Sequence, residues 1–166
     1  MRKRKSNFFF FLKYDILNKR KEVIMKIGIA NDHAGVTQKQ ELVKYLNLLG
    51  YEVINFGTDS EDSVDYPDYA KKLCSAYLKK EIDYGIAICY TGIGMSIACN
   101  KIRGIRAAKV DNVEEAYLTR SHNDANIIVL SARKNMEDLK SFVKIFLETS
   151  FSNEERHIRR IGKLEP

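Results

Sequence analysis

The chain has 166 residues, of which 45% are hydrophobic and 30% are charged, proportions that are typical of globular proteins. This length accommodates one domain with its own hydrophobic core, and the composition excludes a disordered or collagen-like chain. The longest apolar run, Phe8–Leu12, has five residues. It is far shorter than the ~20 apolar residues that a membrane-spanning helix needs.

The formal net charge of +6 comes entirely from the N-terminal segment. Residues Met1–Ile24 carry eight Lys or Arg against two Asp or Glu, whereas Met25–Pro166 carries 20 of each. A surface that binds a nucleic-acid duplex needs a surplus of positive charge to displace counterions. The neutral body of the chain therefore argues against nucleic-acid binding.

Cysteine usage indicates a reducing compartment. Cys74, Cys89 and Cys99 are an odd number and show no C-x-x-C spacing, which argues against a zinc site or a disulfide framework. We therefore expect a cytoplasmic protein with free thiols.

The first 24 residues are set apart from the rest. Basic residues followed by Phe8–Leu12 resemble the start of a signal peptide, but the apolar run is short and no small-residue cleavage site follows. Lys21–Val23 can be encoded by AAG GAG GTN, a ribosome-binding sequence a few bases before the Met25 codon. We expect translation to start at Met25, so that residues 1–24 are a non-native extension and 25–166 form the domain; the alternative is a disordered basic tail.

From Met25 onward, short β-branched runs alternate with amphipathic stretches of helical length, the pattern of βαβ units. The third run is apolar without alternation, which predicts a strand buried on both faces. The predicted strands are Lys26–Asn31, Tyr51–Phe56, Asp83–Cys89, Gly104–Val110 and Asn126–Ser131.

Capping residues mark the helices between these strands. Gly50 suits the end of the first helix, and Pro67 suits the first turn of the second, whose apolar face includes Cys74. Asp111 and Glu114 form a plausible N-cap and N3 pair. Further helices are predicted at Gly92–Lys101, after Asn135 and, partly formed, at Asn153–Ile161.

Together these elements predict an α/β fold: a single doubly wound, Rossmann-like domain with a five-stranded parallel sheet, right-handed crossovers and a C-terminal helical extension. Ligands of such sheets bind outside the carboxyl ends of the strands. The residues that follow the predicted strands are Asp32, His33, Cys89–Ser96, Asp111 and Arg133.

The segment Cys89–Ser96 carries the sharpest chemical signal. It passes from a strand through Gly92 and Gly94 into a helix, where the backbone can approach a ligand and free N–H groups favour an anion. It lacks the spacing of a Walker A loop and the third glycine of a dinucleotide fingerprint. Cys89 stands where these amides favour a thiolate, although most free cysteines, including Cys99 here, act as small buried hydrophobes.

Other polar groups have two interpretations each. Asp32 and His33 are either a turn cap with a surface histidine or functional groups. His122 suits a helix C-terminus, where a partly charged imidazole is favoured, or a site. A solvated helix face or a phosphate clamp would equally explain the basic cluster Arg156, His157, Arg159 and Arg160.

Seven motifs occur in one order and closely resemble those of the type B ribose-5-phosphate isomerases, which share a family with galactose-6-phosphate isomerase subunits. The resemblance extends from Met25 to about Ile161. The motifs are Asn31-Asp32-His33-Ala34-Gly35, Asp65-Tyr66-Pro67, Cys89-x-Thr91-Gly92-x-Gly94, Asn100-Lys101, Gly104-x-Arg106-Ala107, His122-Asn123-x-x-Asn126 and Arg156-His157-x-x-Arg160.

The resemblance implies interconversion of ribose 5-phosphate and ribulose 5-phosphate through an enediolate, without metal or organic cofactor. It also implies a homodimer, or a dimer of dimers, with shared sites. Cys89 resembles the base that moves a proton between C1 and C2, and Thr91 the hydroxyl that passes the second proton. The enediolate oxygens would be held by backbone amides of the loop Tyr90, Thr91, Gly92, Ile93 and Gly94.

By the same resemblance, His122 would open the furanose ring with Asp32 as its helper, and Asn123 would hydrogen-bond the substrate. The phosphate would be bound by His33, Arg133, Arg156 and Arg160.

Two features depart from a simple match. Tyr90 stands where the family usually has a small residue, and His122 precedes the fifth strand, at the opposite end of the sheet from Cys89. A neighbouring subunit would reconcile the second point.

Two alternatives remain open from the sequence. One is isomerisation of a six-carbon sugar phosphate such as galactose or allose 6-phosphate, although the presence of Cys89 and His122 argues against a galactose-type subunit. The other is a non-catalytic module that binds a sugar phosphate or nucleotide and does not turn it over.

Overall fold

The computed structural model describes residues 24–165, so the prediction for Met1–Ile24 lies, except for its last residue, outside the described part. A five-stranded parallel sheet has the order β2-β1-β3-β5-β4. The chain starts near the centre of the sheet and winds outward to both sides, which confirms the predicted doubly wound fold. The strands are β1 (Lys26–Asn31), β2 (Glu52–Asn55), β3 (Tyr84–Cys89), β4 (Ala107–Lys109) and β5 (Ile127–Ser131).

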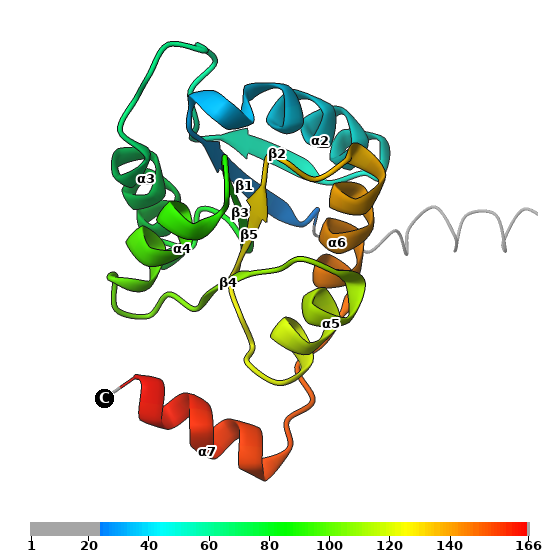
Figure 1. Cartoon of the computed structure of the whole chain (residues 1–166). Helices are drawn as coiled ribbons and strands as arrows, with labels where there is room; N and C mark the ends of the chain where they lie inside the picture. The colour runs from blue at the N-terminus through cyan, green and yellow to red at the C-terminus, as the bar shows by residue number, and fades with distance from the viewer. Residues whose placement is uncertain (1–23, 166) are drawn as a thin grey trace, which may run out of the picture.

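Helices cover both faces of the sheet (Figure 1). One face carries α2 (Val36–Leu48), α5 (Val113–Ser121) and α6 (Met136–Glu148), and the other carries α3 (Tyr66–Leu78) and α4 (Ile93–Asn100). A short 3-10 turn, η1 (His33–Gly35), joins β1 to α2. The last helix, α7 (Glu155–Leu164), lies beyond the sheet layers as the predicted C-terminal extension.

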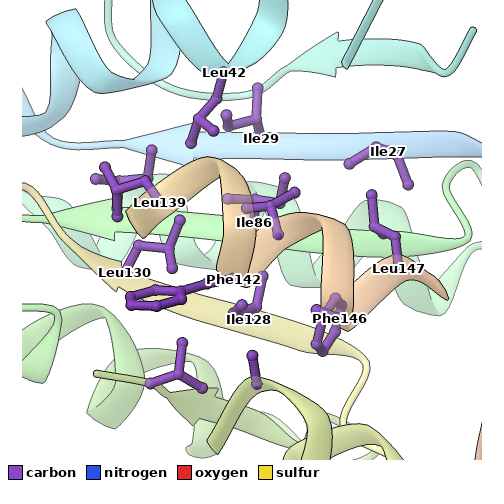
Figure 2. Close-up of a cluster of buried hydrophobic side chains, with 14 of the residues drawn as sticks. Ile27, Ile29, Leu42, Ile86, Ile128, Leu130, Leu139, Phe142, Phe146 and Leu147 are labelled. Carbon is purple, nitrogen blue, oxygen red and sulfur yellow. The ribbon is translucent and has the colours of Figure 1, made fainter. Parts of the chain in front are cut away.

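The two cores follow from the alternation of side chains along strands that are buried on both faces. Ile86 of β3 and Ile128 of β5 point toward α6, where they meet Phe142 and Phe146 (Figure 2). Their strand neighbours, such as Ala87, point to the opposite face and pack beneath α3 and α4. The buried run Ile86–Cys89 of β3 is therefore apolar without alternation, as its sequence predicted, and Ile127–Leu130 of β5 shows the same pattern.

The cap predicted for α5 is wrong by one residue. Asn112, in an extended conformation, is the N-cap, and its side-chain oxygen accepts the backbone N–H of Glu115 at 2.8 Å. Asp111 cannot serve this role because its carboxylate pairs with Lys109 and Lys134. These two ion pairs also lower the pKa of Asp111, Lys109 having the larger effect.

Strand β4 is shorter and α7 is longer than predicted. The backbone N–H of Arg106 donates to the side-chain oxygen of Asn126 at 2.9 Å, so regular pairing with β5 starts only at Ala107. Glu165, just after α7, accepts from the Gly104 backbone N–H at 3.1 Å and from the Arg106 guanidinium at 2.7 Å. These bonds tie the end of α7 to the loop before β4.

Several predicted boundaries are confirmed. Gly50 follows α2 with a left-handed φ of 89°, and Pro67 lies in the first turn of α3. Cys74 and Cys99 are fully buried in the core beneath α3 and α4. No helix within residues 24–165 is long and apolar enough to cross a membrane.

The aromatic anchor of α6 allows a test of the core. Phe146 is fully buried and packs edge-on against Tyr84, with ring centroids 5.6 Å apart. Phe146→Ala should lower the free energy of unfolding by about 3–5 kcal/mol, because it removes a large side chain and leaves a cavity. Chemical denaturation measures the loss, and Lys144→Ala, at an exposed position of the same helix, is the control. Equal stability of the two variants would contradict this packing.

Candidate active site

Three candidate residues lie together at the carboxyl ends of neighbouring strands. Cys89 ends β3, and Asp32 and His33 directly follow β1, which pairs with β3. The backbone N–H of Asp32 donates to Ile88 O at 3.2 Å, so this pairing continues past the end of β1. Cys89 is 5% exposed and lies opposite Ser131 of β5. The candidate base, Cys89, is thus held between two strands in the middle of the sheet.

The loop after Cys89 is held in place by short-range hydrogen bonds. Ser131 Oγ donates to the carbonyl oxygen of Tyr90 at 2.8 Å, and Thr91 Oγ1 accepts the backbone N–H of Ile93 at 3.3 Å. The next two amides, those of Gly94 and Met95, lie in the first turn of α4 and have no intrahelical acceptor. Together with the helix dipole they favour an anion at this end of α4.

Both glycines of the loop are required by close approach. Gly92 has a left-handed φ of 78°, and a Cβ there would lie 3.2 Å from the carbonyl oxygen of Leu130. A Cβ on Gly94 would lie 2.8 Å from the Tyr66 ring. The loop therefore packs against β5 on one side and against the start of α3 on the other. Tyr66 lies within the Asp65-Tyr66-Pro67 motif, but no sequence pattern predicted its contact with Gly94.

Asp32 is a buried carboxyl at the start of η1. It is 6% exposed, and its Oδ1 accepts the backbone N–H of Ala34 at 3.0 Å. Burial raises the pKa of Asp32, and the hydrogen bond from Ala34 opposes this shift. The capping role considered for Asp32 is thus real, and the carboxyl also lies beside β3, the strand that ends in Cys89.

His33 is oriented by the loop between β2 and α3. Its Nδ1 accepts the backbone N–H of Val64 at 3.3 Å. A nitrogen that accepts a hydrogen bond carries no proton, so the neutral ring has its proton on Nε2. His33 can therefore donate one hydrogen bond to an anion.

A cavity of about 530 Å³ opens beside the loop, over the ends of β3, β4 and β5. Arg133, a predicted phosphate ligand, lines it, and its guanidinium lies 5.6 Å from the centre of the exposed Tyr90 ring. Lys109 and Lys134 were not predicted as site residues. Lys109 ends β4 and Lys134 lies shortly after β5, so both stand where the other candidates were sought. The lining residues are Thr91, Ile93, Lys109, Asp111, Ser131, Arg133 and Lys134.

The remaining candidates lie at the opposite edge of the sheet. His122 is the C-cap of α5, and Asn123 follows it as an exposed residue. The His122 ring lies against that of His157 on α7, with centroids 4.1 Å apart. Burial, with a smaller contribution from His122, lowers the pKa of His157. Arg156 and Arg160 are exposed on the same helix.

The structure therefore divides the predicted site into two halves. The Cys89 half lies at the carboxyl ends of the strands, and the His122 half lies before the amino end of β5. Since β5 spans Ile127–Ser131, the two halves are separated by roughly 13 Å or more along the strand. One copy of the chain does not bring His122 to Cys89, as the topology predicted.

The other two thiols, Cys74 and Cys99, are fully buried, whereas Cys89 is 5% exposed. Cys99 has a raised pKa because it hydrogen-bonds the neighbouring Cys74 thiol and because both are buried. A raised pKa keeps a thiol protonated and inert. Cys89, at the end of β3 beside the loop amides, is the thiol placed for chemistry.

Comparisons with known proteins agree with this arrangement. The family model described as "Ribose/Galactose Isomerase" matches residues 27–164. Ribose-5-phosphate isomerase B of Escherichia coli is 40% identical over 137 residues, which cover 82% of this chain and 91% of that protein.

Solved structures show the same fold. A ribose 5-phosphate isomerase from Thermotoga maritima superposes with a TM-score of 0.83 at 50% identity, covering 85% of this chain and 97% of its own. The type B ribose 5-phosphate isomerase of Trypanosoma brucei gives a TM-score of 0.83 at 37% identity, with coverage of 86% and 98%. The chain therefore belongs to the ribose/galactose isomerase family, and it is an isomerase.

Proposed function

We propose that the chain interconverts ribose 5-phosphate and ribulose 5-phosphate. The observation that carries this proposal is the position of Cys89 at the end of β3, directly before a loop whose free amides open helix α4. Aldose–ketose isomerisation needs a base next to a site that holds a developing oxyanion. The names of the Escherichia coli and Thermotoga maritima relatives support the five-carbon substrate.

In this mechanism the Cys89 thiolate removes the proton from C2 of the open-chain aldose, and the electron pair forms the C1–C2 double bond of an enediolate. The loop amides hold the negatively charged oxygen, where charge develops in the transition state. Thr91 passes a proton from the oxygen on C2 to the oxygen on C1. Return of the thiol proton to C1 then gives the ketose and regenerates the thiolate.

We further propose that two copies of the chain complete each site. His122 of the second copy would open the furanose ring, assisted by Asp32, and Asn123 would hydrogen-bond the sugar. The phosphate would lie between His33 and Arg133 of one copy and Arg156 and Arg160 of the other. Arginine suits this role because its guanidinium matches phosphate oxygens in pairs.

Exposed apolar side chains support a homodimer. Ile93 and Ile97 of α4 are 55% and 56% exposed, and Val113 and Tyr117 of α5 are 47% and 51% exposed. Each pair is spaced by four residues and so lies on one face of its helix. Apolar faces of this kind next to a half-site favour association with another protein surface.

A six-carbon sugar phosphate is the second candidate substrate, because the family description includes galactose. Arg133 lines the cavity, and the Tyr90 ring beside it is a large group near the entrance that would limit the length of the sugar. Initial rates on ribose 5-phosphate, allose 6-phosphate and galactose 6-phosphate decide between them. A clear preference for a six-carbon substrate would overturn our choice.

Cys89→Ala should abolish the conversion of ribose 5-phosphate, with substrate binding largely retained, because the base acts in the transition state. A spectroscopic assay of ribulose 5-phosphate formation measures turnover, and calorimetry measures binding. Cys74→Ala, which removes a buried thiol of the core, is the control and should remain active. Substantial turnover by Cys89→Ala would assign the base to another group.

The shared site predicts complementation between two inactive variants. Cys89→Ala and His122→Ala should each be inactive alone, whereas their co-expression should restore about a quarter of the wild-type activity per subunit. About half of the dimers are then mixed, and each mixed dimer has one of its two sites intact. Complementation absent from verified mixed dimers would show that the site is not shared.

The phosphate clamp predicts a defect in binding. Arg160→Ala should raise KM for ribose 5-phosphate roughly tenfold or more, since a charge-assisted hydrogen bond to phosphate is lost. Steady-state kinetics measure KM for this variant and for the control Lys163→Ala, which changes an exposed residue of the same helix. An unchanged KM would remove Arg160 from the clamp.

A further inference from the structure

A buried lysine outside the described site is the strongest unexplained feature of the fold. Lys39 lies on α2, and its side chain is only 2% exposed. A buried ammonium is costly unless it is paired and hydrogen-bonded, so its position requires specific partners. The neighbouring Lys44, on the same helix, has the ordinary exposed position and pairs with Glu41 at the surface.

The partners of Lys39 lie in the loop between β2 and α3. Its Nζ donates to the carbonyl oxygen of Thr58 at 2.6 Å and forms an ion pair with the carboxylate of Asp59. This hydrogen bond from Lys39 lowers the pKa of Asp59, whose side chain is 74% exposed. The lysine thus reaches through the core from α2 and fastens the turn that follows β2.

The carbonyl oxygen of Thr58 also accepts a hydrogen bond from Asn31, the last residue of β1. Asn31 Nδ2 donates both to Thr58 O at 3.0 Å and to Asp32 O at 2.8 Å. The loop approaches Asn31 so closely that a Cβ on Gly57 would lie 1.9 Å from Asn31 Oδ1. Lys39 and Asn31 therefore join the loop to the residue that begins the proposed site.

The far end of this loop contacts the second site residue. Val64, five residues after Asp59, donates its backbone N–H to His33 Nδ1 at 3.3 Å and so fixes the tautomer that donates from Nε2. Residues Ser60–Ser63, which lie between these two attachment points, are exposed. The placement of Val64 thus depends on how the loop is held at Thr58 and Asp59.

From these contacts we propose that Lys39 is a positioning residue of the isomerase, which fastens the β2–α3 loop to β1 and thereby orients His33 for the phosphate of the substrate. This inference rests on the proposed function for the identity of the ligand. The orientation of His33 is independent of the proposed function, because it can be measured without substrate.

The test compares Lys39→Met with Lys44→Met as the matched control. Lys39→Met should raise KM for ribose 5-phosphate roughly tenfold and leave kcat within about twofold, because a misplaced binding group weakens ground-state and transition-state binding alike. Lys44→Met should behave as wild type. An unchanged KM in a folded Lys39→Met variant would overturn the proposal.

Asp59→Asn keeps the test open if Lys39→Met does not fold, since the exposed Asn side chain keeps an oxygen that accepts from Lys39 and the carbonyl oxygen of Thr58 still accepts from the same ammonium. It removes the charge that pairs with Lys39 and should raise KM in the same direction by a smaller factor. Wild-type KM for Asp59→Asn, in the absence of a folded Lys39→Met variant, would count against the proposal.

Nitrogen-15 NMR of the histidine rings gives a readout that a purely structural role would not move. The chain has three histidines, so His33 can be assigned by substitution of the other two. His33 should show an unprotonated Nδ1 and a protonated Nε2 in wild type, and averaged signals in Lys39→Met. An unchanged His33 tautomer would overturn the proposal. Inactivity of the wild type toward ribose 5-phosphate would instead contradict the proposed function and leave this readout intact.

Discussion

The register of three parallel strands is the constraint on which the site depends. Because β3 pairs with β1 on one side and β5 on the other, Cys89 lies between the turn that holds Asp32 and the side chain of Ser131. Ser131 in turn holds the backbone of Tyr90, and Gly92 lets the loop lie directly against β5. A shift of one residue in this register would move Cys89 to the other face of the sheet and away from Asp32 and Ser131.

The same parallel order explains why one chain carries two halves of a site. All carboxyl ends meet at one edge, so every residue that precedes a strand is sent to the other edge. His122 and α7 lie there, joined through the contact between His122 and His157 and through the bonds of Glu165 to the β4 loop. A helix that is anchored at His157 and Glu165 and exposes Arg156 and Arg160 is suited to present charge to the second subunit that we propose.

Features that depend on neighbours in sequence could be predicted. The apolar strands, the left-handed Gly50 and the glycine loop after Cys89 all follow from local rules of backbone conformation and burial. The boundaries that were wrong depend on competing partners: the Asp111 carboxylate pairs with Lys109 and Lys134, and Asn126 takes the N–H that would have extended β4. Which partner a polar group takes becomes visible only in the structure.

The burial of Lys39 could be predicted only in part from the sequence. A lysine in a helix is ordinarily taken as solvent-exposed, yet Lys39 lies three residues after Val36 and three before Leu42, within the buried stripe of α2. A charged residue in such a stripe indicates a buried ion pair, but its partners in the β2–α3 loop become visible only in the structure. The contact between Tyr66 and Gly94 is of the same kind.

The most direct test of the central claim is isomerisation of ribose 5-phosphate in D₂O by the purified protein, with the ribulose 5-phosphate product analysed by NMR. An enediolate mechanism with the Cys89 thiol as proton carrier predicts product with deuterium at C1, because the thiol proton exchanges with solvent between removal and return. Product formed with no deuterium at C1 would contradict proton transfer through a thiol that exchanges with solvent.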